Sequence, residues 1–215
     1  MNAPWLDSER HEAEREADGF LQGVAVAKVT DNRDPRRESR VRVRFPWQPG
    51  EEVSFWARLA MPMTGNKMGT YFLPQVGDEV LVAFERGDQE HAFVIGSLWN
   101  GKAPAPEDNG DGNNDRRLIR SRSGHELRFD DNGSAPEVEL KLQDGKHLKL
   151  DRNGVTVEDE RGNSLTIESA SGSITIKSNA TLSLKAPQIS IEADASLSLN
   201  SSGEISIQGA IVRIN

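Results

Sequence analysis

Residues 165–215 read LTIESASGSITIKSNATLSLKAPQISIEADASLSLNSSGEISIQGAIVRIN, in which an apolar-polar-apolar triplet occurs seven times. Successive triplets begin seven to nine residues apart. Both apolar side chains of a triplet lie on one face of a strand, because side chains alternate between faces. Small polar residues connect the triplets, which indicates tight turns. The apolar positions are Leu165, Ile167, Ile174, Ile176, Leu182, Leu184, Ile189, Ile191, Leu197, Leu199, Ile205, Ile207, Val212 and Ile214.

A fixed period is typical of solenoid architectures, in which neighbouring units cover one another. As one chain, the repeat would form only about two turns of a three-sided helix and would leave its edges open. Three copies around one axis would instead enclose a triangular apolar core. After Phe129 the chain has no aromatic residue, which suits a narrow interior better than a β-sandwich. The repeat therefore predicts an intertwined triple-stranded β-helix, a homotrimeric prism whose trimer core is the set of apolar positions above.

Composition limits the class of protein. The chain has 215 residues, 26 Lys and Arg against 34 Asp and Glu, and a formal charge of −8, which argues against general binding of nucleic acid or anionic membrane. It has no cysteine, so disulfides and thiolate sites are excluded. No segment resembles a membrane span or a signal peptide. We expect synthesis in a bacterial cytoplasm without a signal peptide.

Aromatic residues and longer strand patterns concentrate before residue 101. The segment 40–45 alternates Arg with apolar residues, which places Val41, Val43 and Phe45 inside. Five strand-like segments in about eighty residues favour a small OB-type barrel; they are 23–29, 40–45, 53–59, 79–84 and 92–96. The expected organisation is all-β, with a charged arm at 1–18, an OB domain at 19–101, a linker at 102–117 and a β-helical needle at 118–215.

Two runs in this barrel region, FLPQVGDEVLVAF at 72–84 and VIGSLWN at 94–100, resemble the OB domain of contractile-tail spike proteins. That family includes the phage baseplate assembly protein V group and the valine-glycine-repeat proteins of type VI secretion. RSGHEL at 122–127, followed by Asp130 and Asp131, resembles the start of their needle. The resemblance implies a trimeric spike that docks to a hub through the OB head, assembles into a contractile tail or phage-like particle at its baseplate, and transiently pierces a target outer membrane.

Departures from the family imply separate partner proteins. Large relatives carry a hub-like region before the OB domain, whereas about eighteen residues precede it here, which implies a separate hub protein. Strand alternation continues to the C-terminus, and the last histidine is His147, so a metal-bound tip made by the chain itself is not expected. We expect instead a separate conical tip protein of the proline-alanine-alanine-arginine type on Ile207, Val212 and Ile214.

Candidate chemical sites are weak, and we expect no catalytic, cofactor-binding or metal residue. His11, His91, His125 and His147 lack metal-ligand spacing. Ser123 beside His125 lacks a nucleophile-elbow context. The acidic pairs at 130–131 and 158–160 adjoin glycines and read as turns. The alternatives are a trimeric tail-spike glycosidase or lyase, and an OB module that binds nucleic acid through the arginines. That arginine stripe comprises Arg33, Arg36, Arg37, Arg40, Arg42 and Arg44, and no aromatic residue shares its face.

Overall fold

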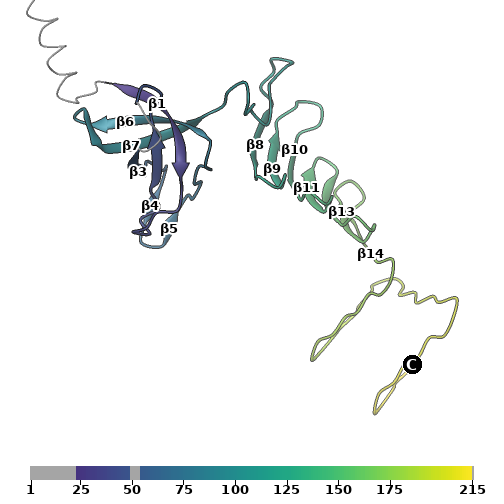
Figure 1. Cartoon of the computed structure of the whole chain (residues 1–215). Helices are drawn as coiled ribbons and strands as arrows, with labels where there is room; N and C mark the ends of the chain where they lie inside the picture. The colour runs from purple at the N-terminus through teal and green to yellow at the C-terminus, as the bar shows by residue number, and fades with distance from the viewer. Residues whose placement is uncertain (1–22, 49–53, 215) are drawn as a thin grey trace, which may run out of the picture. The chain divides into compact units, whose positions relative to one another are not determined.

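The computed structural model describes residues 23–48 and 54–214, and the chain divides into two compact units, Met1–Asp108 and Asn109–Asn215 (Figure 1). The charged arm expected at 1–18 and the residue Val53 lie outside the described residues. The strands have between two and eleven residues. Within the described ranges no helix is long and apolar enough to cross a membrane.

The first unit is a closed five-stranded barrel in the order β1-β2-β3-β7-β6, which confirms the OB-type barrel. Neighbours pair antiparallel except β3 and β7, which are parallel. A two-stranded hairpin, β4 and β5, follows β3. The strands are β1 (Val24–Asp31), β2 (Val41–Arg44), β3 (Phe55–Leu59), β4 (Thr64–Gly65), β5 (Met68–Gly69), β6 (Glu79–Glu85) and β7 (Asp88–Leu98).

The barrel core is formed by every second side chain of each strand, which points inward. Val41 and Val43 on β2 are fully buried, and the ring of Phe45 packs 4.9 Å from Trp47 and 5.4 Å from Phe84, measured between ring centroids. These inward positions agree with the sequence pattern. Since the sheet closes on itself, one chain covers its own apolar residues. The core is Ala27, Val29, Val41, Val43, Phe45, Ala57, Val80, Val82, Ala92 and Val94.

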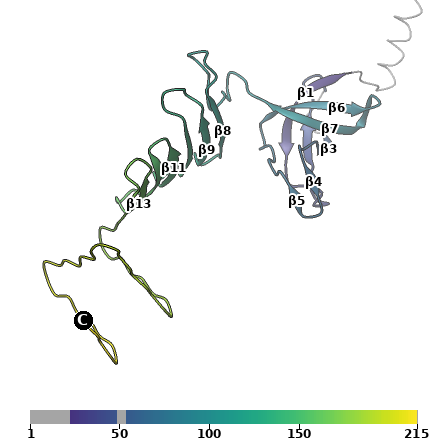
Figure 2. The ribbon, with the colours of Figure 1, turned by 180° about the vertical axis from the view of Figure 1, so that it is seen from behind.

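The second unit is a seven-stranded antiparallel meander, in which every strand pairs with the next one along the chain (Figures 1 and 2). Each strand has five residues. The first begins at Arg116, inside the stretch expected as a linker. From residue 178 to 214 the chain carries no strand. The strands are β8 (Arg116–Arg120), β9 (Glu126–Asp130), β10 (Glu137–Lys141), β11 (His147–Asp151), β12 (Gly154–Glu158), β13 (Ser164–Glu168) and β14 (Ser173–Lys177).

Three of the hairpin turns share one geometry, at 121–125, 142–146 and 159–163. In each, the first N–H donates to the carbonyl of the fifth residue, over 2.8 to 3.1 Å. The fourth residue is a glycine with positive φ: Gly124 (90°), Gly145 (99°) and Gly162 (77°). A three-residue loop ending in a left-handed glycine is a common hairpin connection. These glycines therefore explain why the chain reverses and pairs with itself.

Candidate functional site

The strand register of the meander collects apolar side chains into two parallel rows on one face. Direct cross-strand partners lie side by side, and residues two apart share a face. The first row is Ile119, Leu127, Leu140, Leu148, Val157, Leu165 and Ile176. The second row begins with a charged residue and is apolar thereafter: Arg117, Phe129, Val138, Leu150, Val155, Ile167 and Ile174. We refer to these two rows as the apolar face.

No apolar side chain of this face is buried in the single chain. Leu148 and Leu165 are each 36% exposed, and Ile174 at the last strand is 66% exposed. Contiguous apolar surface of this kind marks an interaction site, since its burial contributes about 1.5–3 kcal/mol for each large side chain. The apolar face therefore has the composition of an interaction surface.

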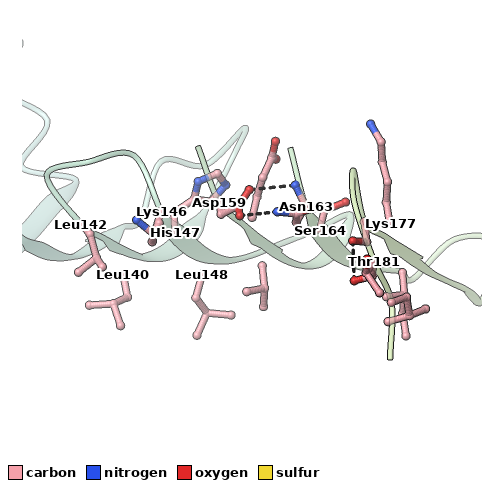
Figure 3. A pocket seen from close by; sticks show the side chains of 15 residues that line it. Leu140, Leu142, Lys146, His147, Leu148, Asp159, Asn163, Ser164, Lys177 and Thr181 are labelled. Atoms are coloured by element: carbon pink, nitrogen blue, oxygen red, sulfur yellow. Dashed lines mark hydrogen bonds between the residues drawn. The ribbon is translucent and has the colours of Figure 1, made fainter. Parts of the chain in front are cut away.

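A groove of about 560 Å³ crosses the apolar face near its C-terminal end. Figure 3 shows Leu140, Leu142 and Leu148 projecting from the same side of the ribbon. Leu182, the first apolar residue of the third triplet, lines the same groove together with Ile176. The stretch after β14 therefore continues the apolar lining after strand pairing has ended.

The opposite face of the meander is polar and begins with a network of ion pairs. The Arg128 guanidinium on β9 lies 2.5 Å from a Glu137 carboxylate oxygen and 2.9 Å from one of Glu139. On β11, the Lys149 ammonium is 3.0 Å from Asp151 and holds the pKa of that carboxyl below its usual value. The row continues on β12, β13 and β14 with Thr156, Thr166 and Thr175. The polar face changes along the sheet from charges to hydroxyls.

Side chains also connect successive turns along one edge of the meander. The His125 Nδ1 accepts a hydrogen bond from the Gln143 N–H at 3.2 Å. Lys146 forms an ion pair with Glu160 at 3.0 Å. The Asn163 Oδ1 accepts from the Asn179 N–H at 2.8 Å, and the Asn179 side-chain amide donates to the Arg161 carbonyl. The Asn163–Asn179 pair fixes the start of the strandless stretch against the turn between β12 and β13.

The residues expected in a trimer core divide into two groups. Leu165, Ile167, Ile174 and Ile176 lie in the two rows on β13 and β14 and pair within the chain. Within the chain, their cross-strand neighbours are Val155 and Val157 on β12 and one another, through turns that contain Gly162 and Gly172. The other ten positions lie between 182 and 214, in no strand, with side chains between 49% and 87% exposed. Ile207, Val212 and Ile214, the expected tip contacts, are among them.

Several residues considered as catalytic or metal-binding candidates form ion pairs within the chain. His91 binds Asp88 over 2.8 Å, and this carboxylate raises the pKa of the imidazole. Asp130 and Asp131 each bind an arginine at 3.1 Å. Among residues 23–48 and 54–214, no group of three His, Cys, Asp or Glu side chains is placed to hold a metal ion.

In the arginine stripe of the barrel, Arg40 lies 2.8 Å from Asp34 and 5.7 Å from the Trp56 ring centroid. Trp56 is also the cross-strand partner of Arg42, so the expectation that no aromatic residue shares the arginine face is wrong. Its guanidinium holds the pKa of Asp34 well below the usual range. The side chain of Asp34 is only 3% exposed, and its carboxylate also accepts the Arg36 and Glu38 N–H groups. This arginine therefore stabilises a loop of the barrel.

Sequence reasoning missed two features of the site. It did not predict the within-chain pairing of the meander, although glycine in the fourth position of each five-residue turn is a readable hairpin signal. It also did not predict the β4–β5 hairpin. Met61, Met63 and Met68 cluster there, and this clustering was the available signal.

Comparison with known proteins identifies the barrel. Residues 25–99 match the family described as the type VI secretion system/phage-baseplate injector OB domain. A type VI secretion system spike protein of Vibrio cholerae, VgrG3, is 29% identical over 113 residues, which cover 48% of this chain and 11% of the relative. In Pseudomonas aeruginosa, the spike protein VgrG4b is 32% identical over 117 residues, which cover 50% of this chain and 14% of the relative. The spike protein VgrG5 of the same organism is 37% identical over 71 residues, which cover 31% of this chain and 9% of the relative.

The chain therefore spans only about a tenth to a seventh of the length of these relatives. The matched region contains nearly all of the closed barrel, whose strands run from Val24 to Leu98. Fold, family match and named relatives agree on one assignment. Residues 25–99 form an OB domain of the type VI secretion system/phage-baseplate injector type, and over this region the chain is similar to type VI secretion system spike proteins.

Proposed function

We propose that three copies of this chain form the central spike of a contractile injection machine. The observation that carries the proposal is the apolar face, which one chain leaves uncovered in a family of spike proteins. Three such faces turned toward a common axis would bury both rows of each sheet in a triangular core. The head is assigned to residues 19–101, the connection to 102–117 and the needle to 118–215.

Beyond β14 the three copies intertwine. The strand β14 has an open edge, and triplets from Leu182 onward keep the apolar alternation without a strand partner in the part of the chain that is described. Strands of the other copies would supply those partners, since open edges recruit strands. The trimer core then consists of the fourteen apolar positions of the triplets, extended by the earlier positions of the two rows.

The needle is the piercing end and the barrel is the hub-docking end. From Leu165 onward only seven charged side chains occur, namely Glu168, Lys177, Lys185, Glu192, Asp194, Glu204 and Arg213. A surface of Ser and Thr costs less to desolvate than a charged one, which favours passage through an outer membrane. A separate conical tip protein covers Ile207, Val212 and Ile214, and a separate hub protein binds the barrel.

The spike acts by force, without catalysis, after assembly at the baseplate in the bacterial cytoplasm. Several of its carboxylates are engaged in turns and ion pairs; for example, Asp159 accepts a hydrogen bond from the Asn163 side-chain amide over 2.7 Å. Measurable cleavage of peptidoglycan or polysaccharide by the pure chain would contradict this part of the proposal.

Solution mass combined with negative-stain imaging tests the assembly. We expect a trimer with a thin needle for the full chain, at micromolar concentration and below. A monomer under these conditions would refute the spike. Deleting residues 1–100 tests the polarity: the remaining chain should still form a trimer but should no longer bind the hub protein, whereas retained hub binding would reverse the assignment.

A further inference from the structure

We propose that the barrels themselves contact one another in a closed ring, through two different apolar surfaces on each copy. The first surface, the barrel strip, lies on the outer side of β1, β6 and β7. The second, the hairpin hollow, lies beneath β4 and β5. This inference rests on the proposed trimer, and the apolar face of the meander takes no part in it.

The barrel strip follows from the register of three neighbouring strands. Val24 pairs with Ala83, which pairs with Phe93, and Val26 pairs with Leu81. The residues between them, such as Val80, Val82 and Val94, point into the core. Val24 is 57% exposed, Val26 42% and Ile95 45%. An apolar strip thus crosses three strands of the convex outer wall, and the Arg58 guanidinium on β3 lies 5.4 Å from the ring centroid of Phe93 at its margin.

The hairpin hollow is concave and preformed. A space of about 600 Å³ lies beside the hairpin, lined by residues that include Leu59, Met63, Met68 and Tyr71. The hairpin is tightly built: a Cβ on Gly69 would lie 2.4 Å from the Met63 carbonyl oxygen, and one on Gly65 would lie 2.8 Å from Met68 Cγ. Met63, Met68, Tyr71 and Phe72 are each more than half exposed. Methionine and aromatic side chains of this kind are typical of docking surfaces.

The two surfaces are complementary in shape and charge. The strip is convex and the hollow is concave. Along β6, Glu79 and Glu85 flank Leu81 and Ala83 on the outer side, and Lys28 on β1 pairs with Glu79. Arg58 and Lys67 line the hollow, with Glu38 as the one acid among its lining residues. The strip therefore offers two acids and one lysine to a hollow with two cations and one acid. Opposite charges around apolar centres orient two surfaces. Copies that each carry a formal charge of −8 repel one another, so contact is favoured at uncharged patches.

A threefold ring requires two different contact surfaces on each copy. In a twofold contact a surface meets itself, whereas each copy in a larger ring offers two different surfaces to its neighbours. Needles that share one axis would tether the barrels through the segment between Leu98 and Arg116, at an effective concentration of about millimolar. At that effective concentration, even a weak contact between the barrel strip and the hairpin hollow would be populated.

Cross-linking of the full chain tests the ring. Because the chain has no native cysteine, only the introduced cysteines can react with the cross-linker. We expect a short bis-maleimide to join Val26→Cys/Met68→Cys chains into covalent dimers and trimers, and neither single variant to cross-link. The matched control is Glu90→Cys/Met68→Cys, which keeps the hollow position and places the other cysteine near the start of β7, outside the strip, instead of on β1. It should not cross-link.

The outcomes separate this inference from the proposed function. A trimeric mass without cross-links in Val26→Cys/Met68→Cys would overturn the ring and leave the spike intact. Cross-links in Val26→Cys alone would show strip against strip and also overturn it. If added hub protein protects the thiol of Val26→Cys from maleimide, in a chain without barrel cross-links, the strip belongs to the hub instead. A monomeric wild-type mass would refute the spike itself.

Discussion

The barrel and the meander use the same sequence device and differ in what covers it. Both alternate apolar and polar residues along short strands. In the barrel, the ten core residues are at most 4% exposed, whereas apolar side chains of the meander such as Leu165 and Ile174 are 36% and 66% exposed. The barrel sheet closes on itself, and the meander stays open. Alternation therefore specifies a face, and topology decides whether the same chain can bury it.

The largest expected effect comes from charging the apolar face. Leu165→Asp places a carboxylate in each copy at the proposed axis, at a cost of several kcal/mol each when buried without a partner. We expect loss of the trimer by solution mass, while the near-ultraviolet signal of the barrel persists. Leu197→Asp should behave alike in the strandless stretch.

The matched control for Leu165→Asp is Thr166→Asp, the next residue on β13 and on the opposite face. It should keep the trimer and change stability by less than about 0.5 kcal/mol. If both variants keep the trimer, the apolar face is not the assembly surface.

A second variant sharpens the comparison from the barrel side. Val82→Ala removes a fully buried side-chain volume, which should destabilise the barrel by about 1–3 kcal/mol. Because the barrel covers its own core, this loss should be independent of protein concentration, unlike melting of the needle. Chemical unfolding at two concentrations measures both. Val76→Ala, at a 60% exposed position, is the control, and an equal loss there would contradict the assignment of the core.

A third variant addresses the polar face. Arg128→Ala removes the cation between Glu137 and Glu139, whose side chains are 22% and 11% exposed. We expect destabilisation of about 1–3 kcal/mol in thermal melting, since partly buried acids would lose a charged hydrogen bond. Partial recovery with Glu139→Gln added would show repulsion between the remaining acids. No change in either variant would indicate that solvent screens the network.

The smallest expected effect is a loss of meander stability at acidic pH. The pKa values of Asp130, Asp151 and Asp159 in the meander lie below their usual value, chiefly because of the Asn132 N–H, Lys149 and Asn163 respectively. A depressed pKa contributes stability above the unfolded value of about 4, and that stability is lost as pH falls through the folded pKa. The urea midpoint of the meander should therefore drop between about pH 5 and 2. Asp151→Asn should reduce this drop, and an unchanged slope would refute the role of that pair.

The sequence predicts the barrel well and the meander only in part. Val41 and Val43 alternate inside β2 and Phe45 continues the pattern directly after it, and the barrel family adds specific motifs. The triplets at Leu165 and Ile174 predict the correct face, because the face depends on alternation alone. Their partners depend on register and turn geometry, and the glycines at 124, 145 and 162 set that geometry locally. An eight-residue period is compatible with pairing inside a chain or between chains.

The hairpin hollow was beyond sequence reasoning for another reason. Its shape depends on close backbone approach at Gly65 and Gly69, and on the tertiary placement of Arg58 and Leu59 beside Met63. Neither strand of this hairpin exceeds two residues, which is too short to show alternation. Clustered methionines remain the one readable sign of such a surface.

The meander has a mechanical consequence that follows from the direction of its hydrogen bonds. These bonds run from strand to strand, from β8 toward β14, perpendicular to each five-residue strand. A thrust along that direction compresses the ladder, and steric contact between neighbouring strands resists it. A pull along the same direction stretches the ladder and can open it one strand at a time, beginning at β14. A sheet of this construction therefore bears load better in compression along the ladder than in extension.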